Sequence, residues 1–156
     1  MPLHSPAKVL VVDDQPSIRT GLRLLIDSEH PHLHTVGAAG NCAEALALVR
    51  RLQPDLVLLD VDLDGEDGLA LVPRLQHESS CRVVVFTSML STPVRQRALQ
   101  LGVHDCLAKT TPARELLARL VAACPPGGGA ELSCPTGREN PVRPGKFSDG
   151  GGPGLE

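Results

Sequence analysis

The sequence is almost devoid of aromatic residues. It contains no Trp, no Tyr and two Phe, of which Phe86 lies in an apolar segment and Phe147 in a Gly- and Pro-rich stretch near the end. A domain built from this chain must therefore have an almost wholly aliphatic core. Apolar residues still make up 42% of the 156 residues, which is enough for one compact domain with an appendage.

Long apolar runs are absent as well. Segments such as 9–12 and 56–59 are far shorter than the ~20 residues that a membrane-spanning helix requires. The chain does not open with a basic stretch followed by an apolar run, so we expect no export signal and a cytoplasmic location. The net charge is -3 with scattered Lys and Arg, which gives no electrostatic case for binding nucleic acid.

Paired cysteine motifs are also lacking. The number of cysteines is odd and none of them forms a CxxC spacing, which argues against a disulfide framework or a zinc site. We expect free thiols, as in a reducing compartment. The cysteines are Cys42, Cys81, Cys106, Cys124 and Cys134.

Short apolar runs rich in β-branched residues alternate with segments of helical periodicity. Asn41 and Ser91 are in position to cap helices, Gly102 to end one, and Pro31 to close the first. The alternation predicts an α/β fold with a five-stranded parallel sheet and helices on both faces. The strand order is left open. The expected strands are 8–12, 34–38, 55–60, 82–87 and 104–108.

The composition changes after Cys124. Gly, Pro and polar residues dominate the rest of the chain, with little to bury. We therefore expect a folded domain over 1–124 and a flexible tail or linker over 125–156.

Chemically active side chains recur at the ends of the predicted strands. Asp13 and Asp14 end the first strand, Asp60 the third and Thr87 the fourth, and Lys109 follows the fifth. The carboxyl ends of parallel strands meet at one edge of a sheet. Converging carboxylates repel one another, and Mg²⁺ together with Lys109 would compensate. The set predicts a phosphoryl-transfer site with Asp60 as nucleophile.

Over about residues 7–123 the chain resembles the CheY-like response-regulator receiver domains. The matching segments are VLVVDDQPSIRTGLRLLI, PDLVLLDVDLDGEDGLAL, VVVFTS and GVHDCLAKT. The resemblance implies a flavodoxin-like fold and phosphorylation by a sensor histidine kinase in the presence of Mg²⁺. It implies that Asp60 is the phosphoacceptor and that Thr87 and Lys109 contact the phosphoryl group and take part in switching. The implied metal ligands are Asp13, Asp14, Asp60 and the backbone carbonyl of Asp62.

Two positions depart from the family pattern. Cys106 stands where the family usually has Tyr or Phe, so the usual aromatic switch is missing. We hypothesise that activation relies instead on shifts of the loop and helix at 88–101. For Cys106 itself we favour a buried, inert thiol over a redox sensor. Asp64 replaces a common Pro, which makes the loop at 62–67 acidic; a solvated loop is favoured over altered cation binding.

The resemblance implies a signalling domain rather than an enzyme. The segment DDQPSIRTGLRLLI is similar to the start of NarL/LuxR-type regulators, which implies transcriptional control, with DNA bound only by an output domain absent from this sequence; a homodimer is also compatible. One alternative is a pseudo-receiver that docks partners without phosphorylation. A second is a hydrolase or nucleotide-binding enzyme, but Asp13-Asp14-Gln15-Pro16 has no Gly-rich phosphate loop.

Overall fold

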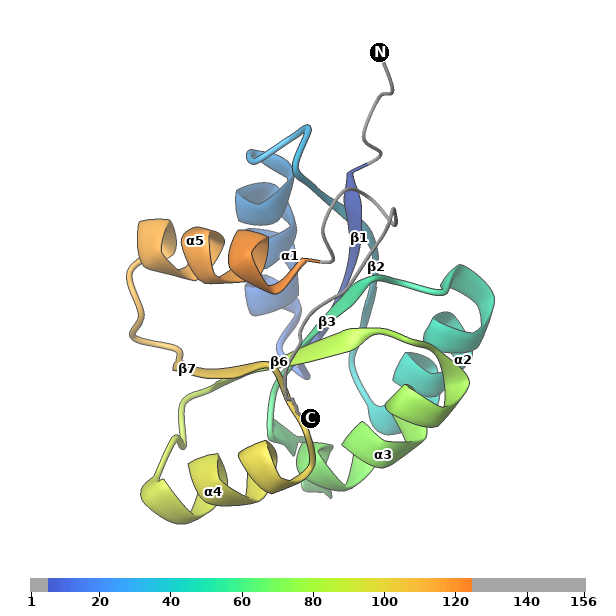
Figure 1. The fold of residues 1–156 in the computed structure, drawn as a ribbon, viewed down its shortest axis with the longest axis vertical. Coiled ribbons are helices and arrows are strands. Elements are labelled where there is room, and N and C mark those ends of the chain that lie inside the picture. The colour runs from blue at the N-terminus through green and yellow to red at the C-terminus, as the bar shows by residue number, and fades with distance from the viewer. Residues whose placement is uncertain (1–5, 125–156) are drawn as a thin grey trace, which may run out of the picture. The chain divides into compact units, whose positions relative to one another are not determined.

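The computed structural model describes residues 6–124, which contain a single five-stranded parallel sheet (Figure 1). The strand order is β2-β1-β3-β6-β7. The predicted tail at 125–156 lies outside the described residues, so its flexibility stays a prediction. The strands of the sheet are β1 (Ala7–Val12), β2 (Leu33–Ala39), β3 (Leu56–Leu59), β6 (Arg82–Thr87) and β7 (Asp105–Ala108).

The central strands are buried on both faces, which explains their continuous apolar sequences. All four residues of β3 are buried, and β1 pairs with it from Val9↔Leu56 to Val12↔Leu59. The register brings the carboxyl ends of β1 and β3 level with each other. β2 lies on one side of β1, and β3, β6 and β7 follow in turn on the other side, so the strand order reverses between β1 and β3. Open parallel sheets bind ligands at this point, beyond the carboxyl ends of the strands.

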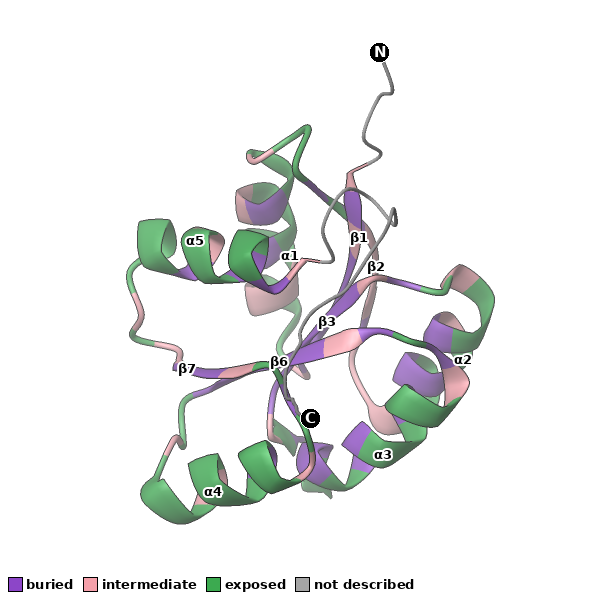
Figure 2. Cartoon of the chain, viewed as in Figure 1, coloured by how far each residue is buried: buried purple, intermediate pink, exposed green. Residues whose placement is uncertain are grey.

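Helices cover both faces of the sheet, as predicted. In Figure 1, α1 and α5 lie on one side, and α2, α3 and α4 lie on the other. Figure 2 shows buried residues along the strands and on the inward helix faces. The helices are α1 (Pro16–Asp27), α2 (Cys42–Leu52), α3 (Gly68–Glu78), α4 (Thr92–Gln100) and α5 (Ala113–Ala123).

The core is aliphatic on both sides of the sheet. Ile26 of α1 and Leu120 of α5 pack with Phe86 on one face, and Val49 of α2 packs with Val72 of α3 on the other. Phe86 is the sole aromatic side chain in residues 6–124 and is buried. The expected aliphatic core is therefore confirmed.

The predicted helix signals at three positions are confirmed. The Asn41 side chain accepts a hydrogen bond from the Glu44 amide at the start of α2, and Ser91 does the same for Val94 in α4. Gly102 adopts a φ of 90°, a conformation that favours glycine, just after α4. Pro31, by contrast, does not close the first helix. α1 ends at Asp27, and turns fill the segment before β2.

A short hairpin follows β3 where we expected only a loop. β4 (Asp62–Leu63) and β5 (Glu66–Asp67) form an antiparallel pair. The turn residues Asp64 and Gly65 have φ values of 54° and 87°. Asp-Gly is a favoured pair for such tight turns, so the signal was present in the sequence.

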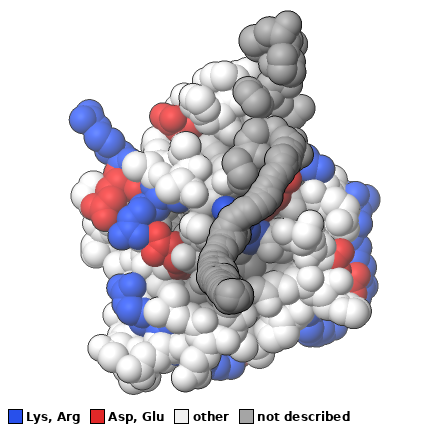
Figure 3. Space-filling model, viewed as in Figure 1, with Lys and Arg blue, Asp and Glu red and all other residues white. Residues whose placement is uncertain are grey.

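None of the helices in residues 6–124 is long and apolar enough to cross a membrane. The four cysteines of this part of the chain are free, in agreement with the sequence prediction. On the face drawn in Figure 3, positive and negative side chains both occur at several places among the described residues.

Candidate functional site

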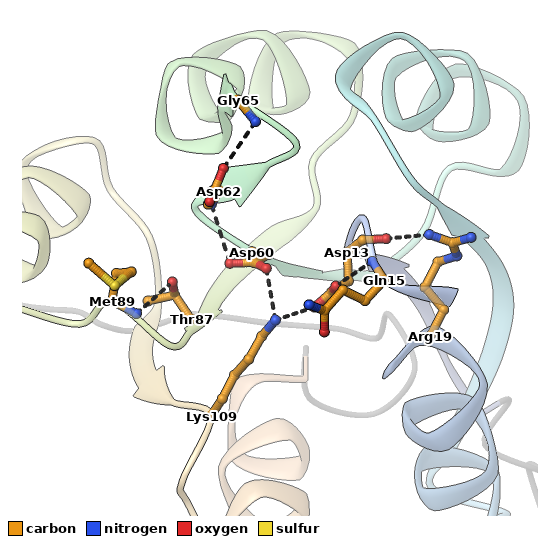
Figure 4. A network of polar contacts seen from close by, with 9 residues as sticks. All are labelled: Asp13, Gln15, Arg19, Asp60, Asp62, Gly65, Thr87, Met89 and Lys109. Carbon is orange, nitrogen blue, oxygen red and sulfur yellow. Dashed lines mark hydrogen bonds and ion pairs between the residues drawn. The ribbon is translucent and has the colours of Figure 1, made fainter. Parts of the chain in front are cut away.

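The predicted site residues meet at the carboxyl edge of the sheet. Asp13 follows β1, Asp60 follows β3, Thr87 ends β6 and Lys109 follows β7. Figure 4 shows Lys109 reaching between Asp13 and Asp60. The structure therefore brings together residues that lie far apart in the sequence.

Three carboxylates form the acidic part of the site. One oxygen each from Asp13, Asp14 and Asp60 lies within 4.8 Å of the others. Asp13 and Asp60 are buried, with exposed fractions of 1% and 5%, whereas Asp14 is partly exposed. Such a group needs a compensating cation, because buried carboxylates in contact cannot all ionise without one.

Lys109 supplies one positive charge to this group. Its Nζ lies 2.6 Å from Asp13 Oδ2 and 2.8 Å from Asp60 Oδ2. Burial lowers the pKa of Lys109, but hydrogen bonds and charges from Asp13 and Asp60 outweigh it, so the pKa is raised. For Asp13, burial raises the pKa and is only partly offset by Lys109 and by the Gln15 amide.

The backbone at the end of β1 holds Asp13 rigidly. The Asp13 amide donates to the Ala39 carbonyl at 3.0 Å, and its Oδ1 accepts from the Gln15 amide at 2.9 Å. The Asp13 carbonyl accepts a hydrogen bond from Arg19 Nη1 at 2.6 Å (Figure 4). Sequence reasoning missed Arg19, because at a helical position it looked like an ordinary surface charge.

The segment after Asp60 is fitted closely to it. The Asp62 amide donates to Asp60 Oδ1 at 3.3 Å, and the Asp62 side chain turns to the Gly65 amide instead (Figure 4). A Cβ at Gly68 would lie 2.1 Å from the Asp60 carbonyl oxygen, so this position requires glycine. Gly68 was not among the site residues predicted from the sequence. The proposed role of the Asp62 carbonyl as a metal ligand stays a prediction.

The acidic loop is largely engaged in contacts of its own. The Glu66 carboxylate accepts from the Cys42 amide at 3.0 Å, and Asp67 caps α3 through the Leu69 amide. Asp67 also pairs with Arg97 of α4 at 2.7 Å. These contacts favour a structural, solvated hairpin over an additional cation site.

Thr87 completes the site on the side of β6. It is fully buried, and its Oγ1 accepts a hydrogen bond from the Met89 amide at 3.2 Å (Figure 4). A hydroxyl that accepts one hydrogen bond still has its own proton to donate. A group attached to Asp60 could therefore accept that proton in a hydrogen bond.

Cys106 lies on the α4 side of the sheet. It is 3% exposed and belongs to the same apolar cluster as Val85, Ala98 and Val103. Its partner across the strand pair is Val85, and the next residue, Phe86, belongs to the core on the opposite face. Burial raises the pKa of the Cys106 thiol, which disfavours the reactive thiolate. The geometry supports the buried, inert thiol.

The donor set fits a hard divalent cation. All the candidate ligand atoms are oxygens, and Mg²⁺ prefers carboxylate oxygens together with water and phosphate oxygens. The partly exposed Asp14 leaves one side of the cluster open to solvent. Soft metal ions, which prefer sulfur ligands, are disfavoured in a cluster of carboxylate oxygens.

The family assignment follows from the sequence itself. A profile described as the response regulator receiver domain matches residues 9–121, most of the chain and all of the site. The chain belongs to the response regulator receiver domain family. It is thus a receiver domain of the kind found in two-component systems, and its fold is CheY-like and flavodoxin-like.

Three similar proteins illustrate the relationship. A protein-glutamate methylesterase/protein-glutamine glutaminase 1 from Syntrophomonas wolfei is 40% identical over 104 residues, 65% of this chain and 29% of the relative. The nitrate/nitrite response regulator protein NarL from Escherichia coli strain K12 is 36% identical over 118 residues, 75% of this chain and 54% of the relative. The response regulator domain of Thermotoga maritima CheB has a TM-score of 0.70 and 27% identity, covering 76% of this chain and 96% of that domain.

The matched segment therefore spans about a third to a half of these two curated relatives. The relatives carry different activities beyond it, one an esterase and the other a nitrate/nitrite response regulator by name.

Proposed function

We propose that this receiver domain accepts a phosphoryl group on Asp60 and thereby switches an output. The observation that supports the proposal is the meeting of Asp13, Asp14, Asp60, Thr87 and Lys109 at one edge of the sheet. None of these residues alone would be sufficient support for the proposal. The combination of a buried carboxylate, two further acids, a lysine and a hydroxyl matches the needs of phosphoryl transfer.

The chemistry assigned to the residues is simple. An Asp60 carboxylate oxygen attacks the phosphorus of a phosphohistidine on a sensor histidine kinase, and an O–P bond forms as the P–N bond breaks. The leaving imidazole nitrogen keeps the electron pair and is protonated. Lys109, already 2.8 Å from Asp60, neutralises negative charge on the transferred group.

Mg²⁺ is the proposed cofactor. Asp13, Asp14 and Asp60 would hold it, with the Asp62 carbonyl as a further ligand. When bound, the ion neutralises the charge that accumulates on the phosphoryl oxygens. Mg²⁺ and the Lys109 ammonium would compete for the Asp13 carboxylate, which lies 2.6 Å from Lys109 Nζ. Once the ion binds Asp13, Lys109 would be released to turn toward the phosphoryl group.

The proposed switch is the hydroxyl of Thr87. A phosphoryl group on Asp60 would accept a hydrogen bond from the Thr87 hydroxyl, and a rotation of the Thr87 side chain toward that group would break the contact with the Met89 amide. Met89 begins the segment that leads into α4, so the change would reach 88–101. With Cys106 buried in place of an aromatic ring, this segment would carry the signal.

The proposed output is transcription, through a DNA-binding domain in the intact protein. The similarity to NarL supports this proposal. The proposed phosphodonor is a sensor histidine kinase, and the proposed location is the cytoplasm. A second copy of the chain, forming a homodimer, is a further proposed partner. The alternative is a pseudo-receiver that acts only by docking.

Intact-mass measurement separates the two functions. The chain is incubated with Mg²⁺ and acetyl phosphate, with EDTA in a parallel sample. We expect one phosphoryl adduct with Mg²⁺ and none with EDTA. An unmodified chain under both conditions would favour the pseudo-receiver.

A further inference from the structure

Arg19 connects α1 to the end of β1. Its side chain is partly buried, and Nη1 donates a 2.6 Å hydrogen bond to the Asp13 carbonyl oxygen. Figure 4 shows the guanidinium lying beside this carbonyl, on the side of Asp13 away from Lys109. Arg19 therefore contacts the backbone of the acidic pair rather than its carboxylates.

The contacted carbonyl belongs to the peptide unit that joins Asp13 to Asp14. Because a peptide unit is planar, fixing its oxygen fixes the direction in which the Asp14 Cα leaves it. The Asp13 carboxylate has restraints of its own from the Gln15 amide and Lys109. Within residues 6–124 the Asp14 carboxylate has no hydrogen bond or ion pair, so its position depends on this peptide plane.

Gly40 supplies an independent observation at the same contact. A Cβ on Gly40 would lie 2.9 Å from Arg19 Nη1 and 3.5 Å from Arg19 Cζ. Gly40 does not have one of the positive φ values that demand glycine. The absent side chain at this position therefore leaves room for the guanidinium, which occupies the space next to the end of β2.

We propose that Arg19 is a positioning residue for the divalent cation: it orients Asp14 through the Asp13–Asp14 peptide. The proposal rests on the proposed Mg²⁺ site. It extends that site to a residue outside the acidic cluster and to Gly40, which leaves room for it. Partners that orient metal ligands typically contribute a factor of about 10–100 to metal affinity.

The sign of the effect distinguishes positioning from simple charge. Arg19 carries a positive charge, so removing it would strengthen cation binding if long-range repulsion dominated. The charge effects that lower the Asp13 pKa come from Lys109, while Arg19 is directed at a carbonyl. Loss of Arg19 is therefore expected to weaken Mg²⁺ binding.

Calorimetric titration of the full chain with Mg²⁺ measures this directly. We expect Arg19→Gln to weaken binding by about tenfold. Arg23→Gln is the matched control, because it removes the same charge from an exposed residue one turn further along α1. This substitution should change the affinity by less than about twofold. Arg19→Lys, which retains a donor, should recover part of the affinity.

A double-mutant cycle tests the contact with Gly40. Gly40→Ala should weaken Mg²⁺ binding in the chain that carries Arg19, because the new methyl group displaces the guanidinium. In Arg19→Gln the same change should have no effect on the affinity. Equal losses in both backgrounds would overturn the inference. Unfolding in urea without Mg²⁺ provides a measure of stability for each variant.

The outcomes separate this inference from the proposed function. Mg²⁺ binding and phosphorylation of the unaltered chain, together with equal affinities for Arg19→Gln and Arg23→Gln, would overturn the role of Arg19 alone. An unaltered chain that does not bind Mg²⁺ would overturn both. An Arg19→Gln chain that binds Mg²⁺ more tightly would show that charge, not positioning, governs this residue.

Discussion

The Lys109 ammonium lies 2.8 Å from Asp60 Oδ2, although 49 residues separate the two in the sequence. The sheet makes this contact, because β3 and β7 flank β6 and all three strands run in the same direction. The same lysine contacts Asp13. A single cation thus joins the ends of the central and edge strands, and removing it should affect both stability and chemistry.

Lys109→Gln should destabilise the folded chain by about 1–3 kcal/mol in the absence of Mg²⁺. The substitution leaves Asp13 and Asp60 buried without their positive partner. Urea unfolding followed by circular dichroism measures the change. Arg114→Gln, at an exposed position of α5, is the control. Addition of Mg²⁺ should restore part of the lost stability, and equal stabilities of the two variants would contradict this prediction.

Cys106 should react much more slowly with iodoacetamide than Cys42 in the folded protein. Cys106 is 3% exposed, whereas Cys42 is only partly buried, and burial raises the pKa of both thiols. Exposure therefore decides the order of reaction. Peptide mass mapping after timed labelling gives both rates. If Cys106 reacted as fast as Cys42, the redox-sensor interpretation would regain support.

The ion pair between Asp67 and Arg97 should contribute to stability only above acid pH. The hydrogen bond and charge of Arg97 hold the pKa of Asp67 below its ordinary value of 3.8. A lowered carboxyl pKa stabilises the folded state above 3.8 and loses that contribution as the pH falls through the folded pKa.

Arg97→Gln tests this pH dependence. The side chains are 50% and 45% exposed, so the loss at neutral pH should be less than about 1 kcal/mol. Urea unfolding of both chains across the acid range should show the difference shrinking below pH 3.8. A difference that grew on acidification would contradict the assignment.

Phosphorylation should change the amide resonances of 88–101 more than those of α1. Thr87 Oγ1 accepts a hydrogen bond from the Met89 amide, and a rotation of Thr87 toward an attached phosphoryl group would break it. Two-dimensional NMR with and without acetyl phosphate reports the shifts. Thr87→Ala should remain phosphorylated but lose most of the response in 88–101. Unchanged resonances in this segment would reject the proposed switch.

Most of the fold could be predicted because each element carries a local signal. The β-branched runs mark strands buried on both faces, and Asn41, Ser91 and Gly102 mark helix ends through contacts or backbone angles within a few residues. The strand order could not be derived in this way. It depends on which helices pack on which face, a property of the whole chain.

The candidate site shows the same division. Asp13, Asp60, Thr87 and Lys109 were found because strand ends converge in any parallel sheet. Arg19 was not found, since its contact crosses from a helix back to the preceding strand, and nothing in the local pattern separates it from Arg23. The hairpin around Gly65 was missed although Asp-Gly is a known turn pair.

Borohydride trapping locates the phosphoryl group most directly. After incubation with Mg²⁺ and acetyl phosphate, hydride reduces an aspartyl phosphate to homoserine with release of phosphate, and peptide mass mapping identifies the altered residue. We predict homoserine at position 60 and at no other aspartate, with none in Asp60→Asn. A reduced residue at Asp13 or Asp14, or an adduct that persists in Asp60→Asn, would contradict it.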